Sequence, residues 1–142
     1  MGAPVVRLLG AADLAVLDDV AAEVFDEAVD PAFWPEFLTD PRHHLAVAID
    51  DGVVVGFASA VHYVHPDKPP QLWINEVGVA PSHQRRGLAG RLLDRLLALA
   101  RELECSEAWV LTDEENLAAR AAYRSAGGEE TSGVVMVTFP LR

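Results

Sequence analysis

The sequence has 142 residues, 51% of them hydrophobic, and carries a formal net charge of -11. This length and apolar share fit one folded domain over residues 1–142 and exclude a disordered chain. The acidic balance argues against nucleic-acid binding, and no apolar run is long enough to span a membrane. The single cysteine, Cys105, excludes an intrachain disulfide and favours a reducing cytoplasm.

The N-terminal third predicts one strand and two helices. Residues 5–9 are β-prone and are followed by Gly10. Asp13 can cap a first helix, because a carboxylate there accepts hydrogen bonds from the free N–H groups of the first turn, and apolar residues follow at helical spacing. Asp30 followed by Pro31 predicts the start of a second helix, since proline suits the first helical position.

The rest of the chain changes from a meander of strands to alternating strands and helices. Strands are expected over residues 45–49, 53–64, 72–79, 108–111 and 134–139, and helices over residues 87–103 and 116–126. Asp51-Gly52 is a strong hairpin-turn sequence between the first two of these strands. The order predicts an α/β fold with a mixed, mostly antiparallel sheet, about four flanking helices and one parallel strand pair.

Residues 80–90 join a strand to a long helix and predict an anion site. The N–H groups at a helix N-terminus are unpaired and carry partial positive charge. Small residues let a phosphate approach this main chain, and arginines add positive charge in an otherwise acidic sequence. These residues are Gly87, Ala89 and Gly90, with Arg85 and Arg86. An ordinary surface loop with solvated arginines is the alternative.

Two motifs follow one another in the second half of the chain. Gln84-x-x-Gly87-x-Ala89 comes directly after a strand, and Asn116 opens a helix in which Tyr123 follows two turns later. In this order and spacing they resemble the two signatures of the GNAT superfamily of N-acetyltransferases. The resemblance covers nearly the whole chain. It implies the acyl-CoA N-acyltransferase fold and acetyl-CoA as cosubstrate.

The region after the second motif departs from the superfamily pattern. Gly128 stands where most members carry an aromatic residue, and residues 128–130 instead look like a branch close to the aminoglycoside 3-N-acetyltransferases. Residues 25–27, and the strand pair 53–64 with 72–79, are similar to that branch too. The resemblance therefore implies acetyl transfer to a primary amine of a small cationic acceptor, such as an aminoglycoside, and so antibiotic resistance. The acidic chain would attract such an acceptor.

The resemblance also implies where acetyl-CoA binds. Two neighbouring parallel strands splay apart, the thioester lies between them, and main-chain groups hold the pantetheine arm and the pyrophosphate. The implied cofactor-binding residues are Val77, Gly78, Val79, Gln84, Arg85, Arg86, Gly87, Leu88, Ala89, Gly90 and Asn116. For Asn116 an ordinary helix cap is an equal alternative.

Direct attack of an amine on a thioester needs a base for the ammonium proton and an acid for the leaving thiolate. Glu76 is the candidate base, because a carboxylate within an apolar strand is costly unless it has a role. It acts directly or through water, and a plain half-solvated strand position is the alternative. Tyr123 is the candidate acid, since the superfamily's Tyr sits at this position, and simple packing in the core is its alternative.

The acceptor site is the least determined part. Candidate acceptor-binding residues are the acids Asp26, Glu27, Asp30 and Asp113, which could instead be solvated or capping, and His62 and Tyr63. The histidines offer no third ligand at metal-binding spacing, so no metal is expected. Two other functions stay open, a protein N-terminal or lysine acetyltransferase and a non-catalytic acetyl-CoA-binding module. Superfamily members are often dimers, and residues 134–139 are the candidate contact of a homodimer.

Overall fold

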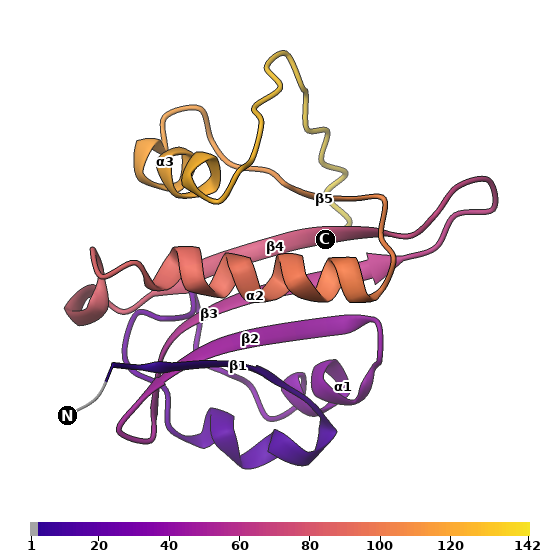
Figure 1. Cartoon of the computed structure of the whole chain (residues 1–142). Helices are drawn as coiled ribbons and strands as arrows, with labels where there is room; N and C mark the ends of the chain where they lie inside the picture. The colour runs from indigo at the N-terminus through magenta and orange to yellow at the C-terminus, as the bar shows by residue number, and fades with distance from the viewer. Residues whose placement is uncertain (1–2) are drawn as a thin grey trace.

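The computed structural model describes residues 3–142, which build one five-stranded sheet with helices packed on both faces (Figure 1). The strands are β1 (Val5–Leu9), β2 (His43–Asp50), β3 (Val53–Tyr63), β4 (Gln71–Val79) and β5 (Glu107–Val110). They lie in the order β1-β2-β3-β4-β5, with β1 to β4 antiparallel and β4 parallel to β5. The predicted mixed sheet with one parallel pair is confirmed.

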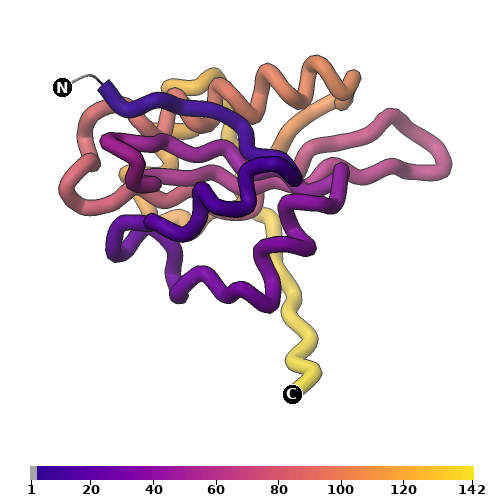
Figure 2. The backbone as a smooth tube through the Cα atoms, turned by 90° about the horizontal axis from the view of Figure 1, so that it is seen from below, coloured from indigo at the N-terminus to yellow at the C-terminus, as the bar shows by residue number. Residues whose placement is uncertain are grey.

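Three α-helices and two short 3-10 helices complete the described elements. These are η1 (Ala11–Asp18), α1 (Trp34–Thr39), η2 (Pro81–His83), α2 (Leu88–Glu102) and α3 (Leu117–Ser125). The amphipathic helix α2 covers one face of the sheet and buries Leu92 and Leu96 completely. The segment from η1 to α1 lies on the opposite face (Figure 2). Within residues 3–142, no helix combines the length and the apolar character that crossing a membrane requires.

The hairpin between β2 and β3 forms as its sequence predicts. Asp51 has φ 50° and Gly52 has φ 79°, and two central residues with positive φ define the turn that fits the twist of paired strands. The sheet core is built mainly by small and β-branched residues of β2 and β3, such as Val47 and Val54, and the leucines of α2 belong to the same buried cluster.

The two N-terminal helices differ from expectation. The Asp13 carboxylate does cap a helix start, because it accepts from the Gly10 N–H (2.8 Å) in a capping box, and it pairs with Arg7 (3.1 Å). The helix that it caps is a 3-10 helix, however, and ends at Asp18. The second helix begins at Trp34 rather than at Pro31. Residues 31–33 form the turn that leads into it, in which the Asp30 carboxylate accepts from the Ala32 N–H (2.8 Å).

The prediction of a last strand over residues 134–139 is wrong for a single copy of the chain. Residues 134–139 form no strand, and their apolar side chains are solvent-exposed, for example 80% for Val135. The end of the chain runs away from the sheet (Figure 2). β-branched residues favour a pleated, half-buried surface, so their preference produces a strand only where a neighbouring strand is available.

Candidate functional site

A gap opens between the parallel strands β4 and β5. They pair only from Gln71 with Glu107 to Ile74 with Val110, whereas β4 continues to Val79. Over residues 75–79, β4 is paired with β3 alone among the described residues. One main-chain edge of this stretch, which includes Val77, is therefore free to bond a ligand between the parted strands.

The loop after β4 presents unpaired N–H groups at the start of α2. The Gln84 side chain donates to the Val79 carbonyl (3.1 Å) and ties the loop to the strand end. Arg85 and Gly87 adopt positive φ, 64° and 75°, and turns of this kind form anion-binding concavities. In the described chain, no N–H of residues 85–90 donates to another main-chain group. A Cβ added at Gly87 or Gly90 would meet nothing within 4 Å, so this rim is open.

A series of hydrogen-bonded side chains connects this loop to the β2–β3 hairpin. His83 Nε2 lies 2.6 Å from Asp50 Oδ2, and His83 Nδ1 lies 2.7 Å from Ser82 Oγ. The His83 side chain is 15% exposed and the Asp50 side chain 34%, so the contact between them is partly shielded from water. Asp50 is distant in sequence, and nothing in the local pattern around His83 predicts this clamp.

On the other face of the sheet, the segment that follows η1 lies directly on β3 and β4. The Phe25 ring stacks on Phe57 with centroids 4.1 Å apart. A Cβ added at Gly78 would come within 2.4 Å of the Val24 carbonyl oxygen, so only glycine allows this approach without a shift. The close packing brings the acids that follow Phe25 to the middle of the sheet, beside Glu76.

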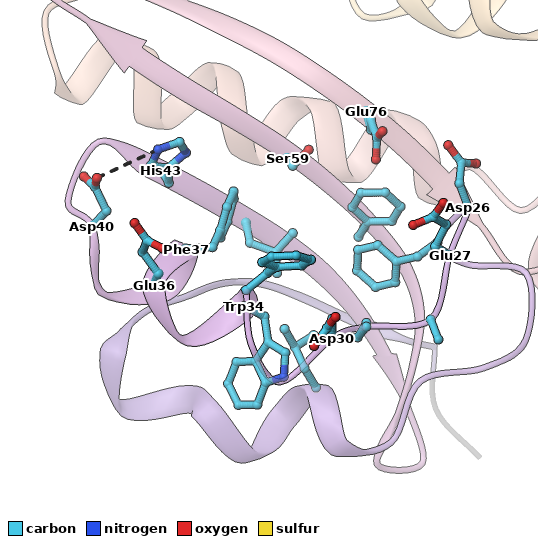
Figure 3. Close-up of a pocket in the computed structure, with 17 residues that line it drawn as sticks. Asp26, Glu27, Asp30, Trp34, Glu36, Phe37, Asp40, His43, Ser59 and Glu76 are labelled. Carbon is cyan, nitrogen blue, oxygen red and sulfur yellow. Dashed lines mark ion pairs between the residues drawn. The ribbon is translucent and has the colours of Figure 1, made fainter. Parts of the chain in front are cut away.

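The space between this segment, α1 and the sheet is a pocket of about 670 Å³ with an acidic lining (Figure 3). Its carboxylates are Asp26, Glu27, Asp30, Glu36, Asp40 and Glu76. Figure 3 draws Asp26 and Glu27 at the Glu76 end and Glu36 with Asp40 at the opposite end. Three of the four expected acceptor acids thus meet the expected base in one cavity. Glu36 and Asp40 were not identified from the sequence, because their proximity to Glu76 arises only from folding.

The same pocket is lined by aromatic rings and holds little positive charge. The rings are Phe25, Phe33, Trp34, Phe37 and Phe57. Among the described residues of the lining, His43 is the one basic side chain, and its Nε2 lies 3.9 Å from Asp40. Alternating carboxylates and ring faces suit a ligand that carries several ammonium groups on an apolar frame.

Glu76 stands on the pocket wall opposite Ser59 of β3. Its neighbour Val77 is directed to the other side of the strand by the alternation of side chains, whereas Asn75 has no partner on β3 because the register shifts there. The Glu76 side chain is solvent-exposed toward the pocket, and it pairs with no cation in the described part of the chain. Its carboxylate can therefore accept a proton from a bound ammonium.

Tyr123 lies half-buried on α3 and packs against the edge of the core. Burial raises the pKa of its phenol above the ordinary value of 10.0. Burial is the sole cause of this shift, and the hydroxyl bonds no other group within residues 3–142. A phenol that stays protonated and unengaged at neutral pH meets the requirements of a general acid.

The ends of α3 explain two features of the second motif. Asn116 caps the helix, its Oδ1 accepting from the Ala119 N–H (3.1 Å), so the capping alternative is realised in this structure. At the other end the Gly128 N–H donates to the Tyr123 carbonyl (2.9 Å). A Cβ at Gly128 would lie 2.9 Å from that same oxygen. The tight turn that closes the helix therefore accounts for glycine in place of an aromatic residue.

Three expected acceptor residues lie outside the pocket. His62 is on the α2 face, with Nδ1 2.7 Å from Nε2 of His44. The Tyr63 hydroxyl donates to Gln71 (3.2 Å) and accepts from Trp109 (3.1 Å), which makes it part of a polar cluster at the far end of the sheet. Asp113 precedes α3, and its carbonyl accepts from the Asn116 N–H.

Comparison with known proteins places these features in one family. The model of the Acetyltransferase (GNAT) family matches residues 10–127. An aminoglycoside N(6')-acetyltransferase type 1 of Stenotrophomonas maltophilia is 30% identical over 145 residues, which cover 98% of this chain and 95% of that protein. The N-alpha-acetyltransferase RimI of Mycobacterium tuberculosis (strain ATCC 25618 / H37Rv) is 32% identical over 111 residues, 77% of this chain and 68% of RimI.

A solved structure shares the fold. The aminoglycoside N-acetyltransferase AAC(6')-Iy, in complex with the bisubstrate analog CoA-S-monomethyl-acetylneamine, superposes with a TM-score of 0.79 at 24% identity, covering 98% of this chain and 99% of that one. The names of these aminoglycoside relatives specify the 6' amine, whereas residues 128–130 suggested the 3-N branch.

Proposed function

The chain belongs to the GNAT acetyltransferase family, and from this premise we propose that it transfers acetyl from acetyl-CoA to a primary amine of a small polycationic acceptor. The observation that carries the proposal is the pocket, whose lining combines six carboxylates, Glu76 among them, with aromatic rings. An aminoglycoside, with several ammonium groups on sugar rings, has this chemistry. The names of the relatives favour a 6' amine as the acetylated position.

The free edge of β4 and the loop before α2 suit acetyl-CoA. The pantetheine arm would form hydrogen bonds with main-chain groups of Val77, Gly78 and Val79, in the way that neighbouring strands of a sheet bond each other. The unpaired N–H groups of residues 85–90, with Arg85 and Arg86, would hold the pyrophosphate. Bound there, the cosubstrate supplies the acetyl thioester.

Glu76 and Tyr123 would manage the two protons of the reaction. Glu76, directly or through one water, takes a proton from the acceptor ammonium and leaves a neutral amine. The amine nitrogen forms a bond to the acetyl carbon as the carbon–sulfur bond breaks. Tyr123 then gives its phenol proton to the departing sulfur, and the second proton of the attacking nitrogen passes through water to the Tyr123 phenolate, which leaves a neutral amide and restores the phenol. Asp26 and Glu27 would bind neighbouring ammonium groups and orient the reacting one.

Turnover with a panel of amines, followed by release of free thiol, tests the proposal. We expect acetylation of aminoglycosides or polyamines. Glu76→Gln should lower kcat/KM by about 100-fold, the usual contribution of a general base. Glu36→Gln is the matched control, because it removes a carboxylate at the opposite end of the same pocket, and it should change mainly the KM of the acceptor.

An N-terminal protein acetyltransferase is the second candidate, supported by the similarity to RimI. It would use the same Glu76 and Tyr123 but would accept a peptide α-amine. Acetylation of peptides by the purified chain, with no turnover of any small polycation, would establish this candidate and refute the first.

We also propose that the enzyme acts in the cytoplasm as a homodimer. The lone Cys105 suits a reducing compartment, and burial raises the pKa of its thiol, which favours the unreactive protonated form. The dimer is the state expected from the family resemblance.

A further inference from the structure

One row of cross-strand partners crosses the sheet under the acidic pocket and ends at Glu76. Leu45 of β2 pairs with Ser59 of β3, and Ser59 pairs with Glu76 of β4. All three residues line the pocket, where Figure 3 labels Ser59 and Glu76. Directly paired residues of neighbouring strands share one face of a sheet, so the pocket face can be followed to the next row.

The next row on this face ends in two tryptophans. It begins at His43, which also lines the pocket, and it crosses β3 at Val61. It continues to Trp73 of β4 and to its partner Trp109 of β5. Side chains of one face recur at every second residue of a strand, so along β3 this row lies about 7 Å from the row of Glu76.

The rings of Trp73 and Trp109, called here the indole stack, have a set position but are partly open to solvent. Their centroids lie 5.0 Å apart with 11° between the planes, and 38% of Trp73 is exposed. The Trp109 Nε1–H donates to the Tyr63 hydroxyl (3.1 Å), which donates to Gln71 Oε1 (3.2 Å). The indole stack therefore presents an ordered aromatic surface on the pocket face of the sheet.

The surroundings of the indole stack are acidic. Two residues beyond Val61, Tyr63 starts a further row on the same face, which pairs Tyr63 with Gln71 and Gln71 with Glu107. Glu107 is exposed and pairs with no cation in the described part of the chain. Carboxylates thus stand on both sides of the stack, at Glu76 and Glu107, and an indole face itself attracts cations.

We infer that the indole stack is a second binding area for the acceptor and takes an aminated ring next to the reacting amine. The inference rests on the proposed acetyl transfer and narrows its substrate class. Along β4, Glu76 lies between the stack and Gly78, on which the segment that carries Asp26 and Glu27 packs. The amine that Glu76 deprotonates therefore belongs to a molecule that extends in both directions.

A glycoside of several aminated rings has this chemistry. One ring binds among the carboxylates of the pocket, and another places its C–H face on an indole and an ammonium group near Glu107. An acceptor with a single ring fills only one of the two areas.

Nuclear magnetic resonance of the wild type with kanamycin, an aminoglycoside of several rings, tests the second binding area without turnover. We expect nuclear Overhauser contacts between the sugar-ring protons of kanamycin and the indole protons of Trp73 or Trp109. Bound kanamycin that contacts neither indole ring would overturn the inference and leave the proposed activity intact. Kanamycin that neither binds nor is acetylated would overturn both.

Kinetics of variants measure what the indole stack contributes to binding. Trp109→Leu removes one ring, so the KM of kanamycin should rise about fivefold, and that of glucosamine, an amine with a single ring, should rise less. Trp109→Phe keeps a ring and should raise the KM of kanamycin less than Trp109→Leu does. Val64→Ala, at an exposed valine of the β3–β4 hairpin, is the matched control and should leave this KM unchanged.

An unchanged KM of kanamycin in Trp109→Leu, or an equal rise for kanamycin and glucosamine, would overturn the inference. If Trp109→Leu fails to fold, the contacts in the wild type decide the question.

Discussion

Tyr123 is the residue whose environment most directly supports a chemical role. Its half-buried phenol has a raised pKa and no bonding partner in the described chain. Tyr123→Phe keeps the ring and its packing but removes the proton. We predict a fall in kcat of about 100-fold, the lower range for a lost general acid, with little change in the KM for acetyl-CoA, measured by thiol release.

The thermal unfolding midpoint of the Tyr123→Phe variant is the control, and it should match that of the wild type because the removed hydroxyl makes no hydrogen bond in residues 3–142. Full turnover by this variant would show that Tyr123 only packs in the core.

His44 predicts a pH dependence of stability. Burial, followed by the nearby His62 and His43, lowers the pKa of His44 from 6.5 to about 4, while Asp40 acts in the opposite direction. Between these values the unfolded chain binds a proton at His44 that the folded chain does not, so the free energy of unfolding falls as pH drops from about 6.5 toward 4. His44→Leu should make this fall smaller.

Urea unfolding of wild type and His44→Leu at about pH 7 and about pH 4.5 measures the difference. The carboxylates titrate in both proteins, so only the difference between them reports His44. Equal losses of stability in the two proteins would contradict the assignment.

At the scale of elements, the clamp from Asp50 to His83 connects the β2–β3 hairpin to the loop before α2. Asp50→Asn replaces the carboxylate with an amide and weakens a hydrogen bond that is strongest when charged. We predict an increase of about tenfold in the KM for acetyl-CoA, equivalent to roughly 1.4 kcal/mol, with kcat nearly unchanged at saturation.

Asp51→Asn is the matched control, because the neighbouring residue of the same turn has positive φ, which asparagine tolerates, and its carboxylate bonds nothing among the described residues. Equal KM values for Asp50→Asn and Asp51→Asn would show that the clamp does not position the loop.

Elements set by neighbouring residues could be predicted from sequence, and those set by distant partners could not. The Asp51-Gly52 turn and the Gly87 loop depend on local backbone preferences. In contrast, η1 ends at Asp18 and the residues after it bond β3, with the Val54 N–H donating to the Asp19 carbonyl, and residues 134–139 lack a strand to pair with in their own chain. The Asp50 clamp joins positions 33 residues apart, so no local pattern reports it.

At the scale of the molecule, the acceptor pocket combines the segment after η1, α1 and two strands. The sequence identified Asp26, Glu27 and Asp30 as acids near helix ends, but the shared cavity with Glu76 arises from the close approach of Val24 to Gly78. That approach is a tertiary contact. His62 and Tyr63 were expected in the acceptor site but lie outside the pocket, because their position on a central strand does not indicate which face or partner their side chains take.

The acidic pocket predicts that acceptor binding weakens with salt. Raising ionic strength shortens the Debye length to about 8 Å at 0.15 M and screens the attraction between the carboxylates and a polycation. At saturating acetyl-CoA, we expect the KM of an acceptor with several amines to rise with potassium chloride, and that of a monoamine to rise less. The same salt response for both acceptors would contradict a role for the clustered acids.

A crystal structure of the chain grown with coenzyme A tests the central claim most directly. The account predicts the pantetheine arm in the gap between residues 75–79 and the end of β5, with the diphosphate bonded to N–H groups of residues 85–90. Coenzyme A bound at another place, or no bound coenzyme A at saturating concentration, would contradict it.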